Sequence, residues 1–133
     1  MPDKVIFIED SGRCVVSNAV LDGSAPLKWM VRDEPRRAED TGWRLFSAVD
    51  TEDDLRDPDK LSVVDFNDVC NVEPALVGIW GFPVGSDLQI VVEDGRKRIV
   101  ETATGRELDE VELYVPGGAP TVIRVDGAPD DDA

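Results

Sequence analysis

The strongest constraint on the fold is a two-residue turn, Asp94-Gly95, between two segments that contain several β-branched residues. Asp-Gly is a preferred sequence for the tight turn that joins two antiparallel strands. The turn therefore predicts a β-hairpin formed by residues 88–93 and 96–101, with Ile90 opposite Ile99. A chain with this hairpin must contain an antiparallel sheet.

Other apolar segments predict further strands. They cover residues 5–8, 14–16, 27–31, 43–49 and 61–64, and a last pair is expected at 110–115 and 121–125. In the segment 27–31, Leu27, Trp29 and Val31 alternate with polar or longer side chains, so all three are expected on one face. This alternation predicts that Trp29 lies in the core.

Short helices are predicted where a capping residue precedes an acidic or apolar turn. Thr51 is a candidate N-cap for a turn that begins with Glu52, and Asp65 is a candidate N-cap for a helix over residues 66–71. The expected fold class is α+β: one small domain over residues 1–126, mainly an antiparallel sheet, with two or three short helices and a C-terminal β-hairpin region. Residues 127–133 are expected to form a disordered acidic tail.

Net charge limits the partners of this chain. Its 133 residues include 29 acidic and 14 basic side chains, which gives a net charge of −15. Nucleic acids and anionic membrane surfaces bind basic proteins, so neither is an expected partner. A basic protein partner is compatible with this charge, although many acidic proteins use such a charge only for solubility. No apolar segment is long enough for a membrane span or a signal peptide, so a cytoplasmic location is expected.

Catalysis and metal binding are not expected. The chain has no histidine, which removes the commonest general base and most zinc sites. Its two cysteines are 56 positions apart in apolar surroundings, and no glycine-rich phosphate loop occurs. A calcium loop starting at Asp50 is rejected because Leu55 stands where glycine is needed. We therefore predict a protein that is not an enzyme and has no cofactor or metal.

Acidic residues are concentrated in residues 50–90, where ten acids and two bases give a net charge of −8. We take the densest part of this region as a candidate binding surface for a basic protein. Trp43 either packs in the core or anchors the partner, and we include it as a candidate. The candidate residues are Asp50, Glu52, Asp53, Asp54, Asp57, Asp59, Asp65, Asp68 and Trp43.

Six short motifs follow one another between residues 12 and 90. They are CVVSN at 14–18, WMVRDEP at 29–35, DTGWRLFS at 40–47, DPD at 57–59, NDVCN at 67–71 and PVGS at 83–86. In this order they resemble the bacterial Imm33-like immunity-protein domain. The resemblance implies a small α+β domain without known catalytic activity, some members of which are thought to protect a bacterium from a polymorphic toxin by binding it.

Two functions remain open at this point. The first is a non-enzymatic immunity protein that binds and neutralises a toxin domain, which is expected to be basic. The alternative is a small-ligand-binding or regulatory domain without a toxin partner, built around the glycine-rich segment 80–85 and the edge of Trp43. Neither the oligomeric state nor the role of the chain after residue 90 is predicted.

Overall fold

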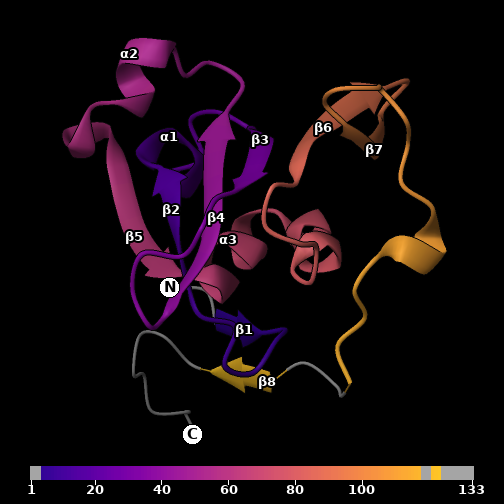
Figure 1. The fold of residues 1–133 in the computed structure, drawn as a ribbon, viewed down its shortest axis with the longest axis horizontal. Helices are drawn as coiled ribbons and strands as arrows, with labels where there is room; N and C mark the ends of the chain where they lie inside the picture. The colour runs from indigo at the N-terminus through magenta and orange to yellow at the C-terminus, as the bar shows by residue number, and fades with distance from the viewer. Residues whose placement is uncertain (1–3, 118–120, 124–133) are drawn as a thin grey trace, which may run out of the picture.

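A six-stranded mixed sheet dominates the computed structural model, which describes residues 4–117 and 121–123 (Figure 1). Its strand order is β5 (Leu61–Asp65), β2 (Arg13–Ser17), β4 (Asp40–Ser47), β3 (Leu27–Arg32), β6 (Asp87–Glu93) and β7 (Arg96–Glu101). The β2–β4 pair is parallel, and the other pairs are antiparallel. The predicted α+β class with a mainly antiparallel sheet is therefore confirmed.

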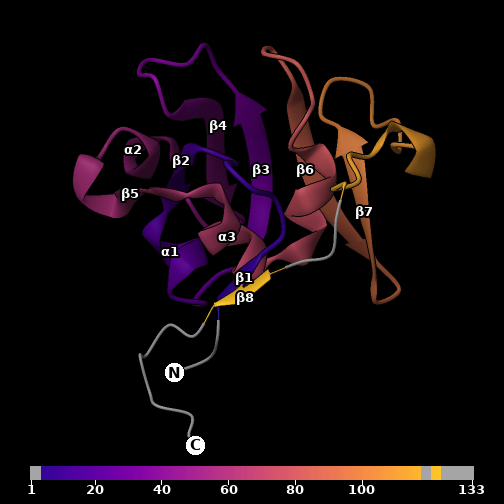
Figure 2. The same ribbon diagram turned by 90° about the horizontal axis from the view of Figure 1, so that it is seen from below.

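Two short helices cover one face of this sheet and enclose the core (Figure 2). They are α1 (Asn18–Leu21) and α3 (Phe66–Val72), and the 3-10 helix η2 (Pro74–Ile79) follows α3. Asp65 caps α3 as predicted, because its carboxylate accepts a 2.8 Å hydrogen bond from the Asn67 amide. The largest fully buried side chains are Trp43, Phe66, Met30, Leu45, Leu76 and Ile79. No described helix is long and apolar enough to cross a membrane.

An acidic projection precedes β5. It consists of α2 (Glu52–Leu55) and the 3-10 helix η1 (Pro58–Lys60), and we call residues 50–60 the acidic lobe. Thr51 is the N-cap of α2, as predicted, and forms a capping box with Asp54. The lobe therefore keeps a defined shape without burying any of its helical residues.

The Asp94-Gly95 hairpin is confirmed with its predicted register. In the pair β6–β7, Ile90 lies opposite Ile99. Leu88 and Ile90 are buried, as their shared face requires. Val92 lies on the same strand but is 61% exposed.

The predicted core position of Trp29 is wrong. The register between β3 and β4 shifts between Leu27 and Trp29, so one extra residue is inserted in β3. A one-residue insertion moves the following side chains to the opposite face. Leu27 and Met30 are therefore buried, and Trp29 is only partly buried on the other face.

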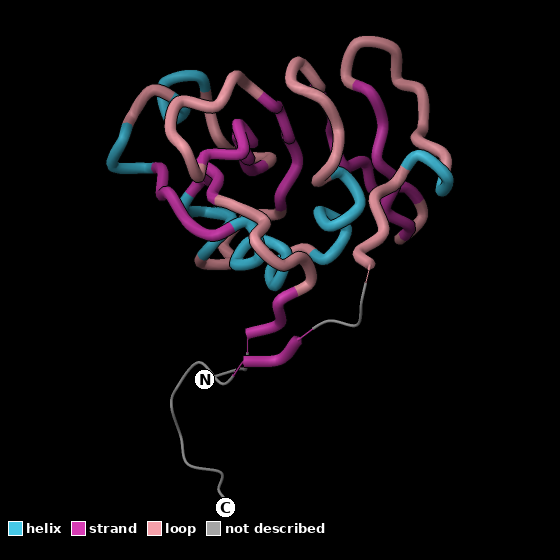
Figure 3. The backbone as a smooth tube through the Cα atoms, turned by 60° about the horizontal axis from the view of Figure 1, so that its bottom comes forward, coloured by secondary structure: helices cyan, strands magenta, loops and turns pink. Residues whose placement is uncertain are grey.

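The predicted last strand pair is also wrong. Residues 110–112 form the 3-10 helix η3 (Glu110–Glu112), which begins where the Asp109 amide donates to the Glu112 carboxylate at 2.7 Å. Strand β8 (Thr121–Ile123) pairs instead with β1 (Lys4–Ile6), at the bottom of Figure 3. Residues 124–125 of the predicted strand, and the predicted tail at 127–133, lie outside the described residues.

Candidate partner-binding site

The structure divides the predicted acidic surface into two parts (Figure 1). Six of the eight acidic residues belong to the acidic lobe, before β5 begins. Asp65 is the last residue of this strand, and Asp68 lies beyond it in α3. The four residue steps from Leu61 to Asp65 along this strand correspond to about 13 Å. Strand β5 therefore lies between the two groups, and we keep the lobe alone as the candidate.

Asp65 and Asp68 are occupied by contacts within the fold. Besides capping α3, the Asp65 carboxylate accepts a hydrogen bond from the Ser11 hydroxyl at 3.3 Å. The Asp68 carboxylate lies 2.8 Å from the ammonium of Lys4, which connects α3 to β1. Both carboxylates therefore have structural roles.

Three carboxylates of the lobe hold its own backbone. Asp50 accepts a 2.7 Å hydrogen bond from the Ser47 amide, and Asp57 caps η1 by accepting one from the Asp59 amide at 2.9 Å. Hydrogen bonding from Thr51, with a smaller contribution from Lys60, lowers the pKa of Asp54. These three side chains fix the shape of the lobe and are poor choices for testing its binding role.

The other three lobe carboxylates are free. Glu52, Asp53 and Asp59 are exposed, and their side chains make no hydrogen bond or ion pair with any described residue. The lobe has six carboxylates and only two basic side chains, Arg56 and Lys60. It therefore presents negative charge that the described part of the chain leaves unpaired.

Trp43 does not belong to this surface. Its side chain is 0% exposed, and its indole nitrogen donates to the carbonyl of Trp80 at 3.3 Å. The guanidinium of Arg32 lies 5.7 Å from its ring centroid. The proposed role of Trp43 as an exposed anchor is therefore wrong, because β4 directs the side chain into the core.

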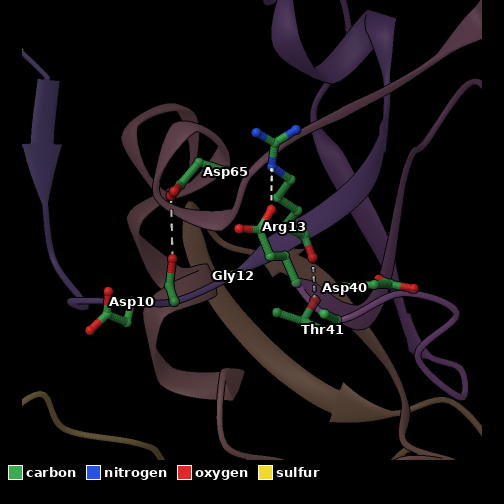
Figure 4. A pocket seen from close by; sticks show the side chains of 9 residues that line it. Asp10, Gly12, Arg13, Asp40, Thr41 and Asp65 are labelled. Atoms are coloured by element: carbon green, nitrogen blue, oxygen red, sulfur yellow. Dashed lines mark hydrogen bonds and ion pairs between the residues drawn. The ribbon is translucent and has the colours of Figure 1, made fainter.

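A second acidic site, which the sequence did not predict, lies where β5 ends and where β2 and β4 begin (Figure 4). This cleft of about 500 Å³ is lined by Asp10, Ser11, Gly12, Arg13, Ala38, Glu39, Asp40, Thr41 and Asp65. Gly12, the residue before β2, allows the close approach of the start of β4: a Cβ there would lie 2.8 Å from the Thr41 methyl group. Because the cleft combines three separate segments, no local motif predicts it.

The charges around this cleft are largely paired. Two 2.9 Å hydrogen bonds from Arg44 hold the pKa of Asp40 well below its usual range. Arg13 lies 3.6 Å from Glu39, and its carbonyl accepts a hydrogen bond from the Thr41 hydroxyl at 2.8 Å. The cleft is therefore a polar surface held by ion pairs.

Neither cysteine has the properties of a nucleophile. Both thiols are buried. Loss of solvation raises the pKa of Cys70 to about 12 and raises that of Cys14 well above its usual range. In the described part of the chain, no three cysteine or carboxylate side chains are grouped closely enough to hold a metal ion.

The glycine-rich segment 80–85 has a structural role that explains part of its composition. The Trp80 ring packs against the Tyr114 ring with 4.9 Å between the ring centroids. A Cβ at Gly81 would lie 3.4 Å from the Tyr114 ring. The Tyr114 amide also donates to the Gly78 carbonyl at 2.7 Å. The segment therefore packs against residues 113–114 of the same chain. This internal packing weakens the hypothesis that the segment binds a small ligand.

Comparison with known proteins identifies the family. A family model described as the immunity protein Imm33 domain matches residues 14–101, about two thirds of the chain. The chain belongs to this immunity-protein family. The family domain runs from β2 through β7, so it contains the acidic lobe and also the β6–β7 hairpin, which the resemblance seen in the sequence had left out. No curated protein and no solved structure matches the chain.

Proposed function

We propose that this protein neutralises a toxin by binding a basic surface of it with the acidic lobe. Membership of the Imm33 family supports a toxin as the partner. The free carboxylates of Glu52, Asp53 and Asp59 are the observation that carries the choice of surface. Their negative charge is exposed and has no partner among the residues that the structure describes. It lies on a projection whose shape is fixed by its own helix caps.

The physical consequence of this binding is steric and electrostatic. Toxin domains that cleave nucleic acids need basic side chains to hold phosphates. An acidic protein bound over those side chains excludes the substrate, and its field accelerates the encounter of the two proteins. In this proposal the protein acts in the cytoplasm by occupying the toxin, without catalysis.

Co-expression tests this function. Cells that produce the cognate toxin domain are expected to grow when the full chain is produced as well, and to stop growing when it is not. Binding of the two purified proteins is expected to account for the protection. Equal loss of growth with and without the chain would contradict an immunity function.

A further inference from the structure

Apolar side chains lie on both faces of the six-stranded sheet. One face carries core residues such as Cys14, Val16 and Leu45, which pack with residues of α1 and α3. Side chains alternate between the two faces of a strand, so the residues next to these core positions point away from the helices. Six apolar residues do so and belong neither to the core nor to the partly buried residues around it. We call them the open face: Val15, Trp29, Val31, Phe46, Val63 and Val91.

The open face forms two rows that cross the strands. In the first row, Val63, Val15, Arg44 and Val31 are neighbours in turn. The second row contains the aromatic pair of β4 and β3. Val63 is 62% exposed, whereas the Arg44 side chain is 11% exposed and its charge is paired within the fold. A sheet buries an apolar face against a second layer, so this face calls for a partner.

Two arginines lie beside the first row. Arg36 and Arg37 line a hollow of about 550 Å³ whose wall includes Val15 and Val63. Both arginines are exposed, and their side chains make no hydrogen bond or ion pair with any described residue. Glu34, from the same loop, does not line the hollow. The other charges of the lining form two pairs, which are Arg13 with Glu39 and Arg44 with Asp40.

The acidic lobe and these arginines lie beyond opposite ends of β4. The loop that carries Arg36 and Arg37 precedes the strand, and the lobe follows it. Because β4 has eight residues, its two ends are about 23 Å apart. Negative charge without a described partner therefore lies at one end of the open face, and positive charge without a described partner lies at the other.

The lobe and the arginines are also aligned with the same strands. The lobe joins β4 to β5, and β2 lies between these two strands in the sheet. The hollow lined by the arginines is likewise bounded by residues of β2, β4 and β5. Figure 2 shows α2 and α3 on opposite sides of β5, which places α2 on the side of the open face.

We propose that two copies of this chain pack their open faces together with their strands antiparallel. The two-fold axis lies between the sheets, at right angles to the strands, and passes the middle of β4. Rotation about this axis exchanges the two ends of the strands but keeps β5, β2 and β4 of one copy over those of the other. The lobe of each copy therefore lies over Arg36 and Arg37 of its partner copy. Sheets packed about 10 Å apart bury the apolar rows between them.

Other occupants match these charges less well. A basic toxin surface would meet Arg36 and Arg37, which repel it. A dimer with its axis along the strands would bring two acidic lobes to the same end. The net charge of −15 opposes any self-association, but at physiological ionic strength charges more than about 8 Å apart are largely screened. The contacts at the two ends therefore favour the antiparallel dimer.

The dimer covers the acidic lobe. Binding of a toxin at the lobe, which rests on the proposed function, then requires the monomer, so the toxin and the second copy exclude each other. The dimer itself does not depend on that function.

Sedimentation equilibrium of the full chain tests the dimer without a toxin. A monomer–dimer equilibrium with a Kd of about 10 µM is expected from an interface of this moderate size. Val63→Glu places an unpaired carboxylate between the two sheets and is expected to weaken the dimer at least about tenfold. Val92→Glu is the matched control, because Val92 is 61% exposed and lies on the other face of β6. This control is expected to stay within about twofold of the wild type.

Exchange of charges tests the arrangement of the two copies. Arg36→Glu with Arg37→Glu, and separately Asp53→Lys with Asp59→Lys, are each expected to weaken self-association about tenfold, because like charges then meet at both ends of the dimer. An equimolar mixture of these two variants is expected to form a heterodimer about as strong as the wild-type dimer, since each lobe again meets a loop of opposite charge.

Three results would overturn the proposal. They are a wild-type chain that stays monomeric up to about 200 µM, a Val63→Glu dimer as strong as that of Val92→Glu, and a mixture of the charge variants that associates no better than each variant alone. Weaker toxin binding by Val63→Glu in a chain that stays monomeric would make the toxin the occupant instead. A monomeric chain that protects cells keeps its immunity function and loses this dimer, and a dimeric chain that gives no protection has the dimer without that function.

Discussion

Replacing Asn67 with alanine is expected to destabilise the protein by roughly 3–5 kcal/mol. Asn67 is 2% exposed, and its side-chain oxygen accepts hydrogen bonds from the amides of Phe7 at 2.9 Å and Ile8 at 3.1 Å. Its side-chain nitrogen donates to the Ile8 carbonyl at 2.8 Å and to the Ser11 hydroxyl at 3.0 Å. Truncation leaves these groups without partners in a place that water cannot easily reach. Urea denaturation monitored by tryptophan fluorescence measures the loss.

Asn71 is the matched control on the same helix. Asn67 bonds the segment after β1, and Asn71 bonds β1 itself, accepting from the Val5 amide and donating to the Val5 carbonyl, both at 2.8 Å. Asn71 is exposed, so water replaces these bonds in the alanine variant. The expected cost is about 1 kcal/mol. Equal losses for Asn67→Ala and Asn71→Ala would show that burial does not set the strength of this contact.

Replacing Trp43 with alanine is expected to cost about 3–5 kcal/mol, because a fully buried aromatic side chain is removed from the core. Trp29, on the neighbouring strand β3, is only partly buried, and its alanine variant is expected to lose about 1–2 kcal/mol. Urea denaturation measures both losses as shifts in the unfolding midpoint, provided that the dependence of the unfolding free energy on urea concentration stays unchanged. A cost for Trp29→Ala equal to or above that for Trp43→Ala would contradict the positions assigned to the two rings.

Trp43→Phe separates a core role from a binding role. Phenylalanine fills most of the indole volume but loses the hydrogen bond to the Trp80 carbonyl, so moderate destabilisation is expected. Affinity for the toxin is expected to stay unchanged in the folded variant. A fully folded variant that binds the toxin more weakly than the wild type would show that Trp43 contacts the toxin.

Features that depend on neighbouring residues were predictable from the sequence. The Asp94-Gly95 turn determines the register of its own hairpin, and Thr51 and Asp65 cap the helices that follow them. In each case the signal and the structure lie within a few residues of each other. Local chemistry therefore identified the hairpin, the capped shape of the lobe and the start of α3.

Features that depend on distant residues were not predictable. The inserted residue in β3 reverses the face of Trp29, and the alternating pattern of the segment does not reveal it. Strand β8 pairs with β1, from the other end of the chain. No periodicity within either segment encodes that pairing.

The candidate site shows the same division. The acidic lobe is continuous in sequence and was predicted, whereas its separation from Asp65 and Asp68 depends on the length and direction of β5. Knowledge of individual contacts also changes which residues to test. The carboxylates of Asp54 and Asp57 hold the lobe together, and those of Glu52, Asp53 and Asp59 have no partner among the described residues.

The association rate with the toxin tests the role of the lobe most directly. The lobe variant Glu52→Gln, Asp53→Asn, Asp59→Asn is compared with a control variant, Glu9→Gln, Asp87→Asn, Glu110→Gln, which removes three exposed carboxylates elsewhere. At low salt the lobe variant is expected to associate about tenfold more slowly than the wild type, with a weaker dependence on ionic strength, and the control is expected to stay within about twofold. Equal association rates for the wild type and the lobe variant would contradict the acidic lobe as the surface that binds the toxin.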